Sequence, residues 1–382
     1  MSRRYHGEIK RIVSFYFNFW RLDFIKFNWK WLNLLKLVTY PIFALTGLFC
    51  STWHVFYQMD DYSDLIDLSF SIVYVFAMYQ AGVIYLTINI LNKNKIQNIL
   101  EHFDRLYNTQ SDMMSNMREK YYEKNTKDAL FFARFFLGSI TIFGVIIVIF
   151  DMHHSKFHMP MLYYFPWIPQ DSFLFYPCNI IMQVVFYFTT LEIMTWSDTI
   201  IMIVIMYCDA ETRTLNEFIS ELDRGNNVRK GAQRILRTIY KNHLSLSEQA
   251  KQFTECVWHI YFHKLLSMTL YLCSILFIFQ SLDTSLIVPV LAFLITIGQI
   301  FILCYFGQII RDSSEITPDT LYMTKWYELN TKDQKKILML LTKIQNSVKV
   351  ETFGFGEISI YTFVQIFKAS VSYATILYTV FM

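Results

Sequence analysis

The last apolar stretch of the chain is Ile358-Ser-Ile-Tyr-Thr-Phe-Val-Gln-Ile-Phe-Lys-Ala-Ser-Val-Ser-Tyr-Ala-Thr-Ile-Leu-Tyr-Thr-Val-Phe381. As a helix that rises about 1.5 Å per residue, it would be roughly 36 Å long, enough to cross a hydrocarbon core of roughly 30 Å. Lys368 carries the single formal charge in the stretch. We therefore expect a membrane-spanning helix here.

One side of this helix is more polar than the rest. Five side chains recur there at steps of four, three, four and three residues: Gln365, Ala369, Ser372, Ile376 and Thr379. Most of these residues are small or polar, and such a seam needs another helix or water against it rather than lipid. The pattern leaves two interpretations open, close packing against a neighbouring helix or a pore lined by copies of the seam.

The composition indicates an integral membrane protein. Of 382 residues, 54% are hydrophobic and only 17% are charged, against about 25% charged in soluble domains. The net charge of +3 is too small to argue for a nucleic-acid partner. No glycine-rich phosphate loop or metal-ligand spacing is present, so we expect no enzyme, cofactor or metal. Three clustered histidines, at 153, 154 and 158, favour packing over a metal site.

Six further apolar runs precede the last one, which predicts an all-α fold of seven transmembrane helices. They cover residues 35–55, 65–91, 129–150, 177–207, 260–279 and 285–310. The aromatic and basic residues of 1–34 suit a membrane interface, and the proline-rich segment 151–176 predicts an ordered non-helical cover. We divide the chain into residues 1–310 with the first six helices, a cytoplasmic segment 311–357, and the final helix in 358–382.

The cytoplasmic segment contains an amphipathic helix and then a break. Over residues 331–349, Ile337, Leu341, Ile344 and Val348 recur at helical spacing opposite lysines. Gly354 and Gly356 then interrupt the helical pattern before the last span.

The positive charges predict the orientation in the membrane. The N-terminal segment and the loops after spans two, four and six contain 29 of the 34 Lys and Arg residues, and the alternate loops contain only Lys156. Because positive residues concentrate on the cytoplasmic side, the N-terminus is expected inside and the C-terminus outside.

Aromatic, methionine and small residues in the outer halves of spans two, three and four predict a pocket. An apolar cavity with a few hydroxyls would take a small volatile organic molecule, although such side chains also simply pack between helices. The candidate ligand-binding residues are Tyr74, Met78, Thr141, Gly144, Tyr187, Phe188 and Leu191.

Two acids and two cysteines of the spans also raise hypotheses. Glu192 lies deep in span four and could take a polar role or bond a neighbouring helix, whereas Asp198 lies nearer the inner end. Cys50 and Cys178 fall near outer ends, but sequence alone does not show that they are close enough to pair.

Several loose motifs, in one order and spacing, resemble insect odorant receptors over essentially the whole chain. They are Phe165-Pro-Trp-Ile-Pro-Gln-Asp171, Asp198, His243, Leu272-Cys273, Asp319-Thr-Leu-Tyr-Met-Thr-Lys-Trp-Tyr, Lys336-Ile-Leu-Met-Leu-Leu-Thr-Lys-Ile-Gln and the final helix. The chain resembles a ligand-tuning subunit of that family.

This resemblance implies an odorant-gated, non-selective cation channel of four subunits in the plasma membrane of olfactory neuron dendrites. Its partners would be the co-receptor Orco, a volatile odorant and membrane lipid. The resemblance also implies that the cytoplasmic segment joins the subunits. The last helix would line the pore, with the gate at Ile376, a polar pore position at Thr379 and Ser372 on the same seam.

Two alternatives remain open at this stage. Gustatory receptors share the fold and act as homotetramers, but they end in Thr-Tyr, five residues, then Gln-Phe, whereas this chain has Ser372-Tyr373 and Thr379-Val380 at those places. That departure favours the odorant branch and fits a subunit that shares a pore with a different partner. A metabotropic seven-helix receptor would have the opposite orientation.

Overall fold

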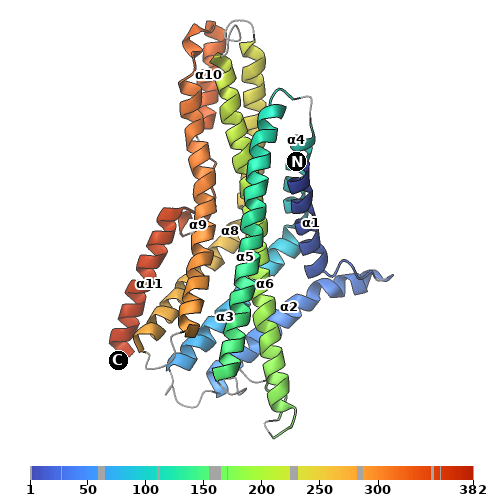
Figure 1. Ribbon diagram of the computed structural model, residues 1–382, viewed down its shortest axis with the longest axis vertical. Helices are drawn as coiled ribbons and strands as arrows, with labels where there is room; N and C mark the ends of the chain where they lie inside the picture. Colours follow the sequence, from blue (N-terminus) through green and yellow to red (C-terminus); the bar gives the residue numbers. More distant parts are fainter. Residues whose placement is uncertain are drawn as a thin grey trace.

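The computed structural model describes residues 2–26, 28–58, 65–109, 112–154, 165–169, 171–223, 231–281, 287–345, 348–352 and 354–381. The described chain is helical except for turns and one short hairpin. Seven of its helices are long and apolar enough to cross a membrane. The long helices run beside one another and give an elongated molecule (Figure 1). The predicted all-α fold with seven spans is confirmed.

The first half of the chain forms the following elements. They are α1 (Ser2–Trp20), α2 (Lys30–Trp53), a π-helical turn η1 (His54–Gln58), α3 (Leu65–Tyr85), a second π-helical turn η2 (Leu86–Leu91), α4 (Lys93–Asn108) and α5 (Ser115–His154).

The second half begins with α6 (Phe175–Ile219), the 3-10 turn η3 (Ser220–Asp223) and α8 (Ala232–Ser281). It continues with α9 (Ile287–Tyr322), the 3-10 turn η4 (Trp326–Glu328) and α10 (Thr331–Ile344). The strands β1 (Glu351–Thr352) and β2 (Gly356–Glu357) pair antiparallel, and α11 (Ile360–Phe381) ends the chain.

Several helices extend well beyond the apolar runs that predicted them. The predicted third span begins at 129, but α5 begins at Ser115, and α8 begins 28 residues before the predicted fifth span. The polar side chains on these extensions are compatible with a continuous helix, because they lie outside the apolar runs and pack against one another. Helix α5 also runs to His154, so the start of the predicted non-helical cover is wrong. Residues 165–169 and 171–174 are non-helical, as predicted.

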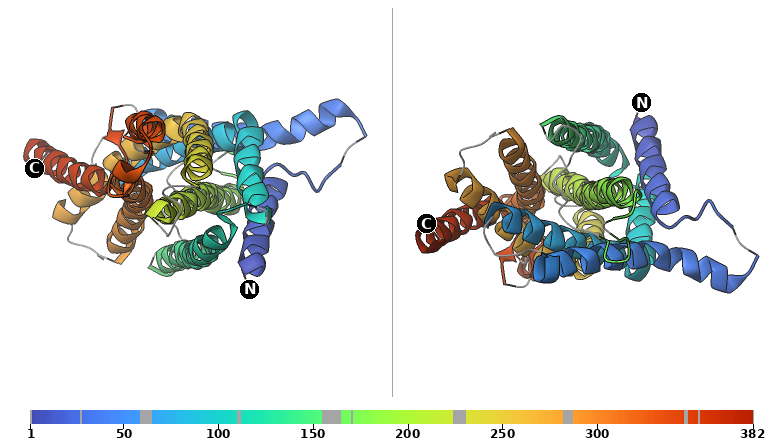
Figure 2. Two further views of the ribbon diagram at one scale, coloured as in Figure 1. Left: turned by 90° about the horizontal axis from the view of Figure 1, so that it is seen from above. Right: turned by 90° about the horizontal axis from the view of Figure 1, so that it is seen from below.

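Helix α6 is the centre of the bundle. It is surrounded by the other long helices when the molecule is viewed along its length (Figure 2). An unbroken run from Ser197 to Thr212 is buried on all sides, and its acidic residues form ion pairs with neighbouring cations. Helices α5, α8 and α9 pack directly on it.

Helix α1 lies against the bundle through polar contacts. The His6 Nε2 and Lys10 Nζ atoms each lie 2.6 Å from one of the two carboxylate oxygens of Asp104 on α4. The hydroxyl of Tyr207 on α6 lies 2.6 Å from His6 Nδ1. The aromatic side chains of Phe15 and Phe19 remain exposed, which suits the predicted interfacial position.

Helix α10 has the predicted amphipathic form. Its N-terminus is capped by Asn330, whose side-chain oxygen accepts a hydrogen bond from the Asp333 backbone N–H at 2.8 Å. Ile337 and Ile344 are buried, and Lys335 and Lys343 are exposed.

A second apolar core, separate from that of the main bundle, forms around α10. It unites this helix with the ends of α6, α8 and α9: Met114, Leu215, Phe218, Ile219, Leu222, Ala232, Ile235, Leu236, Ile239, Leu321, Leu329, Ile337, Leu340 and Ile344. This core lies at one end of the molecule, opposite the C-terminus (Figure 1).

The predicted break before the last helix is a tight hairpin. Gly354 and Gly356 adopt φ values of +78° and +70°, which side chains with a Cβ rarely adopt. The Ile358 N–H donates to the Val350 carbonyl oxygen at 2.9 Å and closes the turn. This hairpin reverses the chain and starts α11 beside α8 and α9.

Candidate ligand pocket and pore helix

Two of the predicted pocket residues lie in a small apolar cluster of their own. Tyr74 and Met78 on α3 pack with Phe186 on α6, Cys50 on α2 and Phe165. The Thr190 hydroxyl of α6 lies 3.2 Å from the Met78 sulfur. This cluster lies between α2, α3 and α6, on the half of the bundle that lies away from α10.

The predicted residues of α5 meet α6 at a close helix crossing. A Cβ on Gly144 would lie 2.7 Å from Leu191 Cδ2 and 3.5 Å from the Tyr187 hydroxyl. One turn earlier on α5, the Thr141 hydroxyl lies 2.9 Å from Glu192 Oε1. The absence of a side chain at residue 144 therefore lets Leu191 and Tyr187 approach α5.

Tyr187 links these two groups of residues. It packs against the α3 cluster and also faces Gly144. The ring of Phe188 lies 5.4 Å from that of Tyr187, centroid to centroid, in an edge-on arrangement. The structure thus brings six of the predicted ligand-binding residues together in a band along α3, α5 and α6, where their side chains fill the space, whereas the ring contact of Phe188 is with its sequence neighbour Tyr187.

Glu192 has partners on both sides. The Trp196 indole N–H donates to Glu192 Oε2 at 2.9 Å, and Thr141 of α5 contacts the other oxygen. The simpler of the two hypotheses for this acid, a hydrogen bond to a neighbouring helix, matches its contacts.

One face of α11 packs on the bundle. Thr362, Ile366, Ser370 and Ala374, spaced four residues apart, are all buried, and Ala374 is only 1% exposed. The Ser370 hydroxyl lies 3.3 Å from the Thr269 carbonyl oxygen of α8. Phe363 packs edge-on against Phe301 of α9 at 5.6 Å between ring centroids.

The predicted polar seam lies on another side of α11. Gln365, Ser372, Ile376 and Thr379 are exposed, with Ile376 at 52%, and Ala369 is half-buried. The seam therefore does not pack against the rest of its own chain. Helix α11 lies at the edge of the molecule, so this side is open to whatever surrounds the subunit (Figure 2).

The start of α11 is held against α9 at one point of very close approach. A Cβ on Gly307 of α9 would lie 2.2 Å from the Ile358 carbonyl oxygen, a distance that the backbone does not allow. The Gln308 side-chain oxygen accepts a hydrogen bond from the Ile360 N–H at 3.3 Å. A glycine at residue 307 thus allows α9 and the first turn of α11 to touch.

A buried ion pair crosses from α6 to α8. Lys264 Nζ donates to Asp198 Oδ2, and both side chains are almost fully buried. The sequence indicated Asp198 as an acid within a span but did not indicate its partner. Lys264 could have been predicted as this partner from the sequence, because it is a cation inside a predicted span and would need a carboxylate there.

The cysteines and histidines give little support for a covalent or metal site. Cys50 and Cys178 are both free thiols in the structure, so the pairing considered for them is not formed. No group of metal ligands occurs in the residues described. His158 lies outside the described part of the chain, as do the side chains of His153 and His154.

These features define a class of protein: a multi-pass membrane protein with an apolar band between its helices and a last helix whose polar side faces outward. The family model described as 7tm Odorant receptor matches residues 66–371. The chain belongs to the odorant receptor family, and not to a family of enzymes.

Individual relatives agree with this assignment. The chain is 25% identical over 159 residues to Odorant receptor 10 of Aedes albopictus, a match covering 41% of this chain and 42% of that one. It is 24% identical over 251 residues to Odorant receptor 13a of Drosophila melanogaster, covering 61% and 59%. The matched stretches thus span less than two thirds of these curated relatives.

The fold is also found in solved structures. The insect olfactory receptor OR5 from Machilis hrabei, in complex with eugenol, superposes with a TM-score of 0.80 at 13% identity and covers 99% of both chains. A second structure of the same receptor gives a TM-score of 0.79 at 12% identity, covering 98% of this chain and 99% of that one.

Proposed function

We propose that this chain is the odorant-binding subunit of a ligand-gated, non-selective cation channel. A small volatile organic molecule binds in the band between α3, α5 and α6, and its binding opens a pore lined by α11. The observation that carries this proposal is the polar seam of α11, which is largely exposed while another face of the helix packs on α8 and α9.

The seam suits a pore wall better than a lipid contact. Three of its five side chains, Gln365, Ser372 and Thr379, carry polar groups, which are costly in hydrocarbon and favourable beside water. Ile376 lies among them with 52% of its surface exposed. A ring of such apolar side chains closes a pore by dewetting, so we assign the gate to Ile376 and the adjacent polar position to Thr379.

The ligand site follows from the character of the α3–α5–α6 band. Tyr74, Met78, Tyr187, Phe188 and Leu191 supply apolar and aromatic surface. Thr141 supplies a hydroxyl, and Gly144 permits the close approach of Leu191. Most small-molecule sites combine such a lining with a few polar groups. The binding of eugenol by a receptor of the same fold supports a small organic ligand for this chain as well.

The positive charges set the orientation. The Lys- and Arg-rich segments include α4 and α10, and α10 lies at the opposite end of the molecule from the C-terminus (Figure 1). We therefore place α10 in the cytoplasm and the C-terminus outside, in the dendritic membrane of olfactory sensory neurons. The cytoplasmic core around α10 then serves as the anchor between subunits.

The proposed partner is the co-receptor Orco in a heterotetramer. The residues at the end of α11 support this reading, because Ser372-Tyr373 and Thr379-Val380 depart from the gustatory pattern. A subunit with a divergent pore segment fits a pore shared with a different chain.

Expression with and without the co-receptor tests the proposal. Cells expressing both chains should give cation currents in response to at least one member of a panel of volatiles. Cells expressing either chain alone supply the controls, with surface labelling to verify equal delivery. Robust volatile-evoked current from this chain alone would contradict the tuning-subunit assignment and favour the gustatory-type homotetramer.

A further inference from the structure

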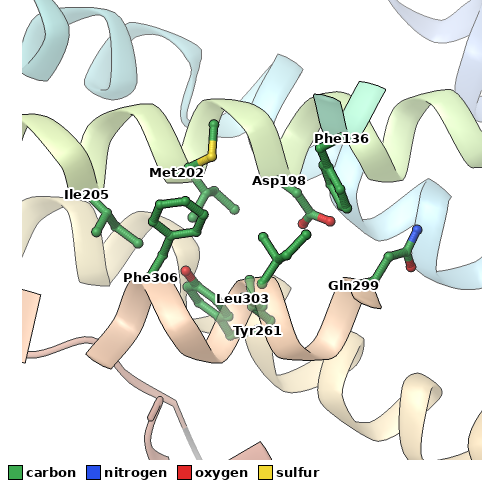
Figure 3. A pocket seen from close by; sticks show the side chains of 10 residues that line it. Phe136, Asp198, Met202, Ile205, Tyr261, Gln299, Leu303 and Phe306 are labelled. Carbon is green, nitrogen blue, oxygen red and sulfur yellow. The ribbon is translucent and has the colours of Figure 1, made fainter. Parts of the chain in front are cut away.

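A small cavity lies inside the bundle, away from the proposed odorant band. It is lined by residues of α5, α6, α8 and α9 and has a volume of about 10 Å³, which holds roughly one water molecule. Most of its lining is apolar, but Asp198, Tyr261 and Gln299 also face it. Figure 3 shows these polar side chains among Phe136, Met202 and Leu303.

The polar groups of this cavity are buried without protein partners. The Asp198 Oδ1 atom and the Tyr261 hydroxyl have no hydrogen-bond partner among the residues described. Both side chains are more than nine-tenths buried, as is Gln299. A buried polar group that makes no hydrogen bond costs about 1–3 kcal/mol, so such groups in native proteins usually bind ordered water.

The ion pair beside the cavity increases the free-energy cost of leaving Asp198 Oδ1 without a hydrogen bond. Lys264 engages only Oδ2 of the Asp198 carboxylate, although an ionised carboxylate offers about four acceptor positions. A buried ion pair overcomes its desolvation penalty only when further hydrogen bonds satisfy the remaining positions. Asp198 lines the cavity, whereas its partner Lys264 does not.

We propose that this cavity is a hydration site, in which ordered water donates a hydrogen bond to Asp198 Oδ1. Water is favoured over a cation because Lys264 already neutralises Asp198, and a second positive charge would be uncompensated inside the membrane. Water is favoured over an organic ligand because the volume admits no larger molecule. The hydrated ion pair then holds α6 to α8, the helix on which α11 packs.

X-ray radiolytic footprinting of the intact receptor complex in lipid nanodiscs tests this site. Irradiated bound water produces hydroxyl radicals in place, and these oxidise neighbouring side chains, which mass spectrometry then quantifies. Met202 lines the cavity, whereas Met206 and Met268 are similarly buried and do not line it. We expect Met202 to oxidise at least about fivefold faster than Met206 and Met268, because buried water persists in polar cavities.

A cavity-filling variant sharpens the test. Leu303→Phe places additional apolar volume in the cavity without removing either member of the ion pair. Oxidation of Met202 should fall toward that of Met206, while oxidation of the exposed Met323 stays unchanged. The proposal is overturned if Met202 in the unmodified receptor oxidises no faster than the two control methionines, or if Leu303→Phe leaves its rate unchanged.

Discussion

At the scale of single residues, Gly144 controls how closely α5 and α6 approach within the proposed odorant site. Gly144→Ala would place a Cβ 2.7 Å from Leu191 Cδ2, so the leucine must move into the space used by ligand. Overpacking of this kind costs about 1–3 kcal/mol, so we expect the half-maximal odorant concentration to rise about fivefold or more.

Dose–response curves on cells co-expressing Orco measure this effect. Gly138→Ala on the same helix is the matched control, because nothing lies within 4 Å of a Cβ there. In a Leu191→Ala background the clash is absent, so adding Gly144→Ala there should change sensitivity little relative to Leu191→Ala alone. Equal sensitivity of Gly144→Ala and Gly138→Ala would exclude residue 144 from the site.

At the residue scale, the sequence indicates the size and polarity of a side chain but not its distant partner. The structure places Thr141, Gly144, Tyr187 and Leu191, which the sequence analysis named as pocket candidates, at one helix crossing. Their role in binding a ligand stays a prediction. The pairing of Asp198 with Lys264 was missed, because residues 66 positions apart meet only once α6 and α8 are packed.

At the scale of elements, the junction between α9 and α11 connects the bundle to the proposed pore helix. Gly307→Ala would place a Cβ 2.2 Å from the Ile358 carbonyl oxygen, and the backbone there has no flexible end that could move aside. We expect the first turn of α11 to shift and the maximal odorant-evoked current to fall strongly.

The control for this junction lies on the same helix. A Cβ on Gly298 would have no atom within 4 Å. Replacing a glycine by alanine inside a helix usually stabilises the helix by about 0.5–1 kcal/mol. Whole-cell current, normalised to surface-labelled receptor, should therefore stay normal in Gly298→Ala and fall in Gly307→Ala. Normal currents in both variants would mean that this contact does not position α11.

The existence and order of the helices were predictable, but their ends were not. Hydropathy finds only the part of a helix that lies in hydrocarbon, so α5 and α8 were predicted too short. The hairpin before α11 was foreseen as a break because Gly354 and Gly356 permit positive φ. The antiparallel pairing of β1 with β2 in this hairpin was not predicted, because two-residue strands leave no sequence pattern.

At the scale of the whole molecule, the surface of α10 carries apolar side chains that its own chain leaves uncovered. Leu338 and Met339 are 66% and 71% exposed, while their neighbours Ile337 and Leu340 are buried. Covering such a side chain in an interface contributes about 1.5–3 kcal/mol. We expect Leu338→Ser/Met339→Ser to leave the subunit folded and to reduce its association with Orco.

Co-purification of tagged subunits from detergent measures this association. Lys343→Ser changes an exposed polar residue of the same helix and should leave the complex intact. Full recovery of Orco with the double variant would show that α10 does not contribute to the interface.

The central claim is that the seam of α11 faces an aqueous pore, and cysteine accessibility tests it most directly. Ser372→Cys and Thr379→Cys lie on the seam, whereas Val371→Cys is exposed on another side of the helix. With Orco present, a charged thiol reagent applied during odorant stimulation should irreversibly reduce current through the two seam variants. The reagent should leave the current through Val371→Cys and through the unmodified receptor unchanged. A reduced current in Val371→Cys, with unchanged current in the two seam variants, would contradict the account.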